Sequence, residues 1–416
     1  MTERLPQELK EHVLDCLDGA TMVGRRALQA CALVNSSLLP RSQSLLFHDI
    51  TIRNPQDVCN LSKVPHRLQA QVHVLRVAAT FHFERQHRSA PSPTPDITAL
   101  AKLLMRLPAV YDLRIDNSHH AVYYVFLPIA MCRALLAKLP LLRSLTLNRW
   151  TVPTSILNHL GNIQELHLTD VRFSAGFMPK VRPREQATRT AKLVHFAFEV
   201  KERDSLLELS NTIARLGVGG SSTSSAGLRT PIDLTSLRSL RLQVAGVPKE
   251  QGLILDACKD TLEALEYGRT KSIVGASRAY PSVNFVTMPR LQTLAIRDVN
   301  PNEVSEREFL EKLIRSAPNM QQLILNVNPT LYPLHEQPLW AWLDAALTAD
   351  DAALTGLRGL TLVIGPARGQ PRHPAFYEGK REFLDNALRK VQSRMPVQIK
   401  RYVAWQERPP LLEFSL

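Results

Sequence analysis

Few residues in this sequence have the types and the spacing that catalysis requires. The run from Gly217 to Ser221 is rich in glycine, as phosphate-binding loops are, but it lacks the lysine that would contact a phosphate. The sequence contains no Gly-x-Ser-x-Gly, His-Glu-x-x-His or EF-hand spacing. We therefore expect a protein with no catalytic residues and no cofactor.

Histidine and cysteine are the remaining candidates for chemistry, as metal ligands. His119 and His120 are adjacent, and adjacent side chains on a strand point to opposite faces, so they do not readily share a metal. His82 and His87 form a second, equally weak candidate. The cysteines are odd in number and no pair has Cys-x-x-Cys spacing. We expect neither a metal site nor a disulfide framework, and we interpret all five cysteines as buried thiols: Cys16, Cys31, Cys59, Cys132 and Cys258.

Charge is distributed unevenly along the chain. The formal net charge is +13, and residues 1–50 hold five basic and six acidic side chains, so the remaining residues carry +14. One basic cluster surrounds the single acid Glu185 and comprises Lys180, Arg182, Arg184, Arg189 and Lys192. A second comprises Arg389, Lys390, Arg394, Lys400 and Arg401.

Three interpretations of these basic clusters remain open. They can be solvated loops, they can bind nucleic acid weakly through its phosphates, or they can receive an acidic or phosphorylated protein substrate. Aromatic residues are sparse and do not alternate with the basic ones, so stacking on bases is not supported. Nucleic acid is therefore the least favoured partner of the three.

The composition is that of a globular chain, with 44% hydrophobic and 21% charged residues. The stretch from Asn117 to Cys132 has no formal charge, but it contains two histidines and Pro128, and a membrane span needs about 20 mostly apolar residues. Residues 1–6 include no apolar core like that of a signal peptide. We expect no contact with a membrane and a location in the cytoplasm, the nucleus or both.

A short apolar pattern recurs ten times from about residue 70 onward: apolar, two residues, apolar, one residue, apolar. The last two apolar positions are two residues apart, which is strand spacing and places both side chains on one face. We call each instance a triplet. The middle residues of the ten triplets are Leu75, Leu113, Leu145, Leu166, Phe196, Leu240, Leu265, Leu294, Leu323 and Leu360.

Helical segments are expected between these strands. Asp96 can cap a helix that reaches Leu107, and Ser305 with Glu308 has the spacing of a capping box. A proline ends a helix and favours an extended residue before it. Four prolines each lie five residues before the middle residue of a triplet: Pro108, Pro140, Pro289 and Pro318.

Repeated helix, turn and short strand is typical of a solenoid, in which each unit buries its apolar edge against its neighbours. We therefore predict an α/β fold with an irregular leucine-rich-repeat solenoid over residues 51–416. Loop insertions are expected near residues 85–95, 178–192 and 217–230. A protein partner would bind the exposed strand positions beside Leu113, Leu145, Leu166, Leu294, Leu323 and Leu360.

The first fifty residues follow a different pattern. Pro6 suits the first turn of a helix, and a second helical segment runs from Ala27 to Leu39 before Pro40 ends it. Two or three short helices hardly enclose a core by themselves. We expect this unit to complete its apolar surface on a neighbour or a partner, through residues at helical spacing such as Leu9, Val13, Leu14 and Leu17.

Several short segments within residues 4–50 carry a recognisable pattern: Leu5-Pro6-x-Glu8-Leu9, Val13-Leu14-x-x-Leu17, Leu28-x-x-Cys31-Ala32-Leu33-Val34 and Leu46-Phe47. They resemble an F-box of the fungal type, a motif that commonly precedes leucine-rich repeats. The resemblance implies that residues 1–50 are an F-box-like helical docking unit for the Skp adaptor protein and, through it, a cullin. It also implies that the solenoid holds a protein substrate for a Skp-cullin-F-box (SCF) ubiquitin ligase, without catalysis of its own.

Carried over by position, the resemblance assigns adaptor contacts to Leu5, Pro6, Leu9, Leu14, Leu17, Leu28, Leu33, Val34 and Leu38. Leu38 stands where family members usually carry tryptophan, a frequent interface anchor, so this departure predicts weakened adaptor affinity. Two alternatives remain. The leucines can pack only on the solenoid as an N-terminal cap, which leaves a non-ligase interaction scaffold. The basic body can instead make the chain a weak nucleic-acid binder.

Overall fold

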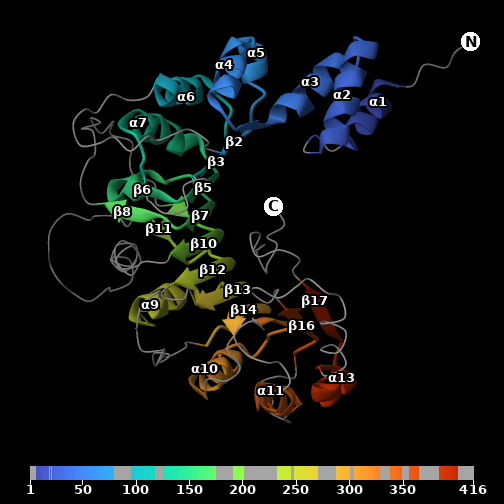
Figure 1. Ribbon diagram of the computed structural model, residues 1–416, viewed down its shortest axis with the longest axis vertical. Coiled ribbons are helices and arrows are strands. Elements are labelled where there is room, and N and C mark those ends of the chain that lie inside the picture. Colours follow the sequence, from blue (N-terminus) through green and yellow to red (C-terminus); the bar gives the residue numbers. More distant parts are fainter. Residues whose placement is uncertain are drawn as a thin grey trace, which may run out of the picture. The chain divides into compact units, whose positions relative to one another are not determined.

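The computed structural model describes residues 6–17, 19, 21–78, 95–117, 125–174, 191–200, 232–244, 248–269, 287–299, 304–327, 338–348, 356–364 and 384–401. The chain divides into two compact units, Met1–Ala191 and Lys192–Leu416. Each unit combines α-helices with parallel β-strands (Figure 1), so the predicted mixed α/β class is confirmed.

The first unit begins with three helices and continues with a parallel sheet. The helices are α1 (Gln7–Asp15), α2 (Met22–Val34) and α3 (Leu39–His48). The sheet has the order β1 (Asp49–Ile52), β2 (Val74–Ala78), β3 (Asp112–Asp116), β5 (Ser144–Asn148) and β7 (Glu165–Thr169). Further helices lie on one side of this sheet (Figure 1): α4 (Pro55–Lys63), α5 (His66–Gln69), α6 (Pro95–Arg106) and α7 (Ile129–Lys138).

A second, smaller parallel sheet of the first unit comprises β4 (Val125–Phe126), β6 (Trp150–Pro153) and β8 (Arg172–Ser174). Short 3-10 helices, η1 (Leu139–Leu141) and η2 (Thr154–His159), precede β5 and follow β6. The chain turns between the two sheets at Arg149 and Asp170, both with left-handed backbone at φ 59° and 49°. Trp150 is buried and donates its indole N–H to the carbonyl oxygen of Ile115, 3.3 Å away, which ties β6 to the strand of the main sheet.

The second unit repeats the same arrangement of helices and parallel strands. Its sheet has the order β10 (His195–Val200), β12 (Ser239–Val244), β13 (Ala264–Arg269), β14 (Thr293–Val299), β15 (Gln322–Val327), β16 (Gly359–Ile364) and β17 (Val397–Arg401). Its helices include α9 (Pro248–Cys258), α10 (Val304–Arg315), α11 (Pro338–Thr348) and α13 (Arg389–Arg394). Two very short strands are β9 (Ala191–Lys192) and β11 (Ile232–Asp233).

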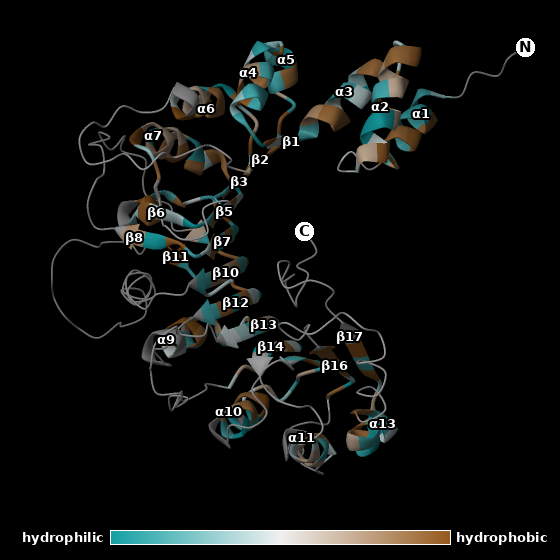
Figure 2. Ribbon diagram, in the orientation of Figure 1, coloured by the Kyte–Doolittle hydropathy of each residue, from teal (hydrophilic) through white to brown (hydrophobic). Residues whose placement is uncertain are grey.

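The triplets form the core of both sheets. A strand is present at each of the ten predicted positions, and the middle residue of every triplet is at most 1% exposed. Neighbouring middle residues lie in register, as in the pairing of Leu113 with Leu145. Hydrophobic residues therefore follow the strands (Figure 2), and each fully buried side chain of this kind stabilises the fold by about 1.5–3 kcal/mol.

Several sequence predictions differ from the structure in detail. Strand β1 spans the boundary predicted at residue 50, so the helical part of the N-terminal unit ends at His48. Ser305 lies inside α10, one residue after its start, and does not cap it. The helix expected after a cap at Asp96 is present as α6, but it begins at Pro95, so Asp96 lies inside its first turn and does not precede it. Apart from Pro95, Ala191 and Lys192, the insertions expected near 85–95, 178–192 and 217–230 lie outside the described residues.

Candidate docking surface

The three N-terminal helices form because each has a clear start. Thr21 caps α2, since its hydroxyl oxygen accepts the backbone N–H of Gly24 at 3.1 Å. Pro6 precedes α1, and α3 carries a proline in its first turn. Leu14 of α1 and Leu28 of α2 are 1% and 0% exposed, so they make the small core of this helical unit.

The outer faces of α1 and α2 are apolar and open to water. Ten large hydrophobic side chains are exposed in the described part of the chain, and six of them lie between residues 9 and 34. Exposed apolar side chains at this density mark an interaction surface, because isolated ones are normal but concentrated ones are not. We call these six the docking surface: Leu9, Val13, Met22, Val23, Leu33 and Val34.

The six side chains occupy three places on the two helices. Leu9 and Val13 are four residues apart on α1 and therefore share one face of it. Met22 and Val23 begin α2, and the last turn of α2 carries the two most exposed side chains of the set, Leu33 at 89% and Val34 at 83%. Both ends of α2 thus present apolar side chains to water.

The adaptor contacts assigned from the sequence differ in their exposure to water. Leu9, Leu33, Val34 and Pro6 are exposed, and Leu17 and Leu38 are half-buried, Leu38 directly preceding α3. Leu14 and Leu28 are buried and can serve a partner only by holding the exposed residues in place. Leu5 lies outside the described residues.

Three residues of the docking surface were not among the assigned contacts: Val13, Met22 and Val23. Val13 follows Leu9 by four residues, so helical spacing could have identified it. Met22 and Val23 follow the capping Thr21 directly, and nothing in the sequence separates such first-turn residues from core residues.

The exposure of the docking surface bears on the cap interpretation. A cap on the repeats would bury Leu9, Val13, Leu33 and Val34 against the sheet or its helices, but each is more than half exposed. The docking surface therefore does not pack on the repeats of its own unit.

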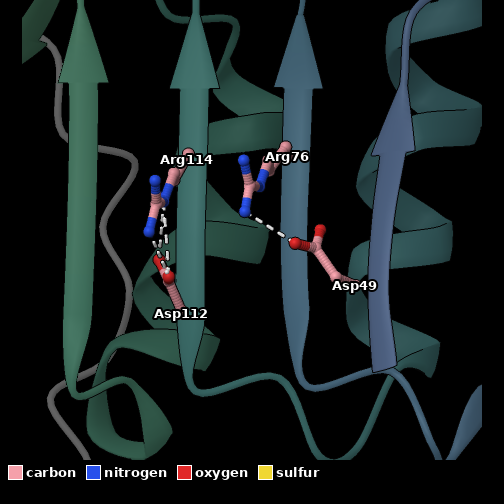
Figure 3. A network of polar contacts seen from close by, with 4 residues as sticks. All are labelled: Asp49, Arg76, Asp112 and Arg114. Atoms are coloured by element: carbon pink, nitrogen blue, oxygen red, sulfur yellow. Dashed lines mark hydrogen bonds and ion pairs between the residues drawn. The ribbon is translucent and has the colours of Figure 1, made fainter. Parts of the chain in front are cut away.

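A polar network lies on the sheet of the first unit, on the face opposite the buried leucines (Figure 3). Arg76 of β2 contacts Asp49 of β1 through one nitrogen, at 2.6 Å. Arg114 of β3 contacts Asp112 two residues earlier, with its Nη2 at 2.9 Å and its Nε at 3.3 Å from the same oxygen. Arg76 and Arg114 are opposite each other in the register of β2 and β3, so each aspartate offsets the repulsion between two adjacent guanidiniums.

The corresponding face of the second unit is different. The sequence predicts exposed positions beside Leu294, Leu323 and Leu360, but the residues that follow these leucines are buried: Ala295, Ile324 and Thr361. Ala295, Ile324 and Val363 form an apolar cluster there, and such side chains are stable only when they are shielded from water. The prediction of exposed positions is therefore wrong for this part of the second unit.

Within the described residues, no three histidine, cysteine, aspartate or glutamate side chains lie close enough to hold a metal ion. The histidines considered as ligands, His82, His87, His119 and His120, lie outside the described residues, as does the glycine-rich run from residue 217.

The prediction that all five cysteines are buried is wrong for three of them. Cys16 and Cys59 are exposed and Cys31 is half-buried, whereas Cys132 and Cys258 are buried. Burial raises the pKa of the Cys132 thiol to about 11 and that of Cys258 to about 12, so neither is a nucleophile at neutral pH.

The basic clusters are only partly described. Lys192 is the only residue of the cluster between residues 180 and 192 that the structure describes. In the second cluster, Arg389, Lys390 and Arg394 are exposed on α13. The exposure of these few residues is compatible with solvated loops, with a nucleic-acid partner and with an acidic protein substrate.

Comparison with known proteins adds no relative. No protein-family model matches the chain, and no curated protein matches it either. Among the helices that the structure describes, none combines the length and the apolarity needed to cross a membrane.

Proposed function

We propose that this protein is a substrate-recognition subunit of an SCF-type ubiquitin ligase. Helices α1–α3 dock on the Skp adaptor protein, which links the chain to a cullin, and the repeated strands and helices bind a protein substrate. The observation that carries the proposal is the docking surface, six water-exposed apolar side chains on the segment that resembles an F-box.

The repeats support the second half of the proposal. Ten strands carry the same leucine triplet, pair in parallel with their neighbours and alternate with helices, as expected of an irregular leucine-rich-repeat solenoid. A solenoid of this kind offers a long row of strand positions to a partner. Such a subunit binds and positions its substrate, and the transfer of ubiquitin is carried out by other subunits.

The energetics favour a partner for α1 and α2. Removing one exposed leucine or valine side chain from water contributes about 1.5–3 kcal/mol, and a few well-packed side chains usually dominate an interface. Leu9, Leu33 and Val34 combine high exposure with helical positions, and they are the residues we expect to contribute most. Leu38 offers less buried area than the usual tryptophan, so we expect a weaker complex than the family forms.

The test is co-purification of the intact chain with a Skp adaptor protein. The variant Leu9→Asp plus Leu33→Asp places two charges on the docking surface. The matched control, Met105→Asp plus Ile129→Asp, places two charges on similarly exposed apolar residues of α6 and α7. We expect capture by the intact chain and the control, and loss with the docking-surface variant. No capture by the intact chain, or equal loss with the control, overturns the proposal.

A protein-interaction scaffold that no longer reaches a ligase is the second candidate. Leu38 favours it, because the family's tryptophan anchor is missing at the start of α3. If the intact chain captures no adaptor, this candidate becomes the better one. A weak nucleic-acid binder is a third, supported only by the exposed basic residues of α13.

A further inference from the structure

We infer that the open sheet face of the first unit binds an extended, basic segment of a protein partner. The inference rests on the proposed function in that it names the chemistry of the segment that the repeats would hold. We call this surface the acidic face. It consists of the strand residues that alternate with the buried leucines: Asp49, Thr51, Val74, Arg76, Ala78, Asp112, Arg114, Asp116, Ser144, Thr146, Asn148, Glu165, His167 and Thr169.

The acidic face is more open than the corresponding face of the second unit, where Ala295, Ile324, Thr361 and Val363 are buried. Only Asp112 and Ser144 are buried among its residues, and the others are half-buried, as side chains are on a sheet that faces water on one side. It is also polar, because Val74 and Ala78 are its only apolar members. A partner would therefore meet hydrogen-bonding groups and charges here.

The charge of the acidic face is opposite to that of the chain. It carries four carboxylates and two guanidiniums, a formal charge of −2, whereas the whole chain carries +13. Both guanidiniums are engaged, Arg76 with Asp49 and Arg114 with Asp112 (Figure 3). The excess negative charge therefore belongs to the two other carboxylates, Asp116 and Glu165.

Asp116 and Glu165 form no close ion pair among the described residues, although Glu165 lies within the electrostatic range of Arg114. Asp116 accepts one hydrogen bond from the neutral side-chain amide of Asn148, at 2.8 Å. Glu165 forms no side-chain hydrogen bond or ion pair with any residue that the structure describes. Burial by itself would lower the pKa of Arg114, but the hydrogen bond that Arg114 donates to Asp112 and the charges of Asp112, Asp49 and Glu165 outweigh it and raise that pKa.

A side-chain hydroxyl lies beside Glu165 on this face. Ser144 pairs with Glu165 on one side and with Asp112 on the other, and the residue as a whole is 7% exposed. Its hydroxyl forms no hydrogen bond with a described residue, and it does not belong to the buried unpaired groups, so it is open to water or to a partner. A lysine or arginine bound at Glu165 can donate to the hydroxyl oxygen of Ser144 as well.

The separation of the two carboxylates gives the length of the partner segment. Asp116 pairs with Asn148 and Thr169, and Glu165 lies four residues before Thr169 on β7. With strands about 4.8 Å apart and residues rising about 3.3 Å, the backbones of Asp116 and Glu165 are roughly 16 Å apart. Side chains of an extended segment share one face only when they are an even number of positions apart, and four positions rise about 13 Å. Two arginines four positions apart therefore fit the acidic face, because their long side chains span the rest of the distance to the two carboxylates.

The test uses a fluorescein-labelled peptide with two arginines four positions apart in a serine–glycine background, so that both side chains of the extended peptide point to one face. Binding to the intact chain is measured by fluorescence anisotropy at low salt. The variant Asp116→Asn plus Glu165→Gln removes both charges with little change in shape. The matched control, Asp260→Asn plus Glu308→Gln, removes two exposed charges from the second unit, at residues that belong to neither proposed surface. We expect saturable binding that salt weakens, at least tenfold weaker in the face variant and within twofold of wild type in the control.

Three outcomes overturn the inference: no saturable binding, equal loss in the control, or binding of a phosphorylated acidic peptide in place of the basic one. The last of these would restore the acidic substrate as the better interpretation. Adaptor capture is measured on the same preparations, because both pairs of substitutions leave Leu9 and Leu33 in place. A chain that binds the peptide but captures no adaptor overturns the ligase proposal and leaves the acidic face standing.

Discussion

Gly268 of β13 and Arg297 of β14 are opposite each other in the sheet of the second unit, and the glycine makes room for the arginine. A Cβ atom on Gly268 would lie 3.0 Å from the Cβ of Arg297 and 3.3 Å from the Cγ of Gln243. Arg297 forms an ion pair with Glu266, which is fully buried and also contacts Arg241 at 2.9 Å. The missing side chain at Gly268 thus allows a buried charge network to form.

Replacement of Gly268 by valine is expected to destabilise the protein. The added atoms must displace Arg297 and Gln243, and overpacking of this kind typically costs about 1–3 kcal/mol. Each kcal/mol lowers the melting temperature by about 2–4 °C for a unit of this size. Gly252→Ala on α9 is the control, because a Cβ there meets nothing within 4 Å. Alanine in a helix should stabilise it by about 0.5–1 kcal/mol. Equal melting temperatures for the two variants would contradict this account.

Gln69 is expected to be essential for the end of α4. Its side chain is fully buried and donates to the carbonyl oxygens of Leu61 and Val64, both at 3.0 Å. Gln69→Leu leaves the carbonyl of Val64 unpaired, whereas that of Leu61 still accepts the backbone N–H of Val64, and one unsatisfied buried group costs about 1–3 kcal/mol. Gln56→Leu on the exposed side of α4 should change the free energy of unfolding by less than about 0.5 kcal/mol. Urea unfolding of both variants measures the difference, and a neutral effect of Gln69→Leu would show that water replaces the lost bonds.

The repeated strands could be predicted because each triplet has apolar residues at strand spacing, with its last two positions two residues apart. Leu113 and Leu145 each follow a proline by five residues, and both lie in the middle of a strand. Strand β1 carries the same triplet, Phe47, Ile50 and Ile52. It was not predicted as a strand because Phe47, the first position of the triplet, belongs to the last turn of α3. Strand β17 was missed for another reason. Arg394 occupies the position where the first apolar residue of a triplet would be.

The docking surface could be predicted only in part, because one helix can carry two apolar stripes. Val13 and Leu14 are adjacent and project about 100° apart around α1, so one faces water and the other the core. Helical spacing identifies both but does not say which stripe is buried. The acidic face could not be predicted, since the pairing of Arg76 with Asp49 depends on strand register across 27 residues.

The stability of the first unit is expected to fall in mild acid. Burial lowers the pKa of His48, the nearby His73 and Arg41 lower it further, and Asp49 opposes them. The rings of His48 and His73 are 5.0 Å apart. Because the unfolded chain binds the proton more tightly, the free energy of unfolding is at its full value above about pH 6.5 and is lost as the pH falls through the lowered pKa.

Substitution of His48 tests this dependence. The free energy of unfolding, measured with urea, should fall more between pH 7.5 and pH 5 for wild type than for His48→Asn. Burial also lowers the pKa of His159, so His159→Asn should reduce the slope in the same direction, and the double variant should reduce it further. If the free energy of unfolding of a single variant depends on pH as it does in wild type, the histidine replaced in that variant does not contribute to the pH dependence.

Substitutions in α1 and α2 should separate stability from docking. Leu14→Ala and Leu28→Ala each remove a fully buried side chain, and such changes cost about 2–5 kcal/mol because they leave a cavity. Leu33→Ser and Val34→Ser change exposed side chains and should alter the free energy of unfolding by less than about 0.5 kcal/mol. The same two serine variants should weaken adaptor capture, since the free protein does not need these side chains and a partner does. Thermal unfolding and co-purification of the four variants decide the matter, and a large loss of stability in Leu33→Ser would mean that this end of α2 packs on the protein itself.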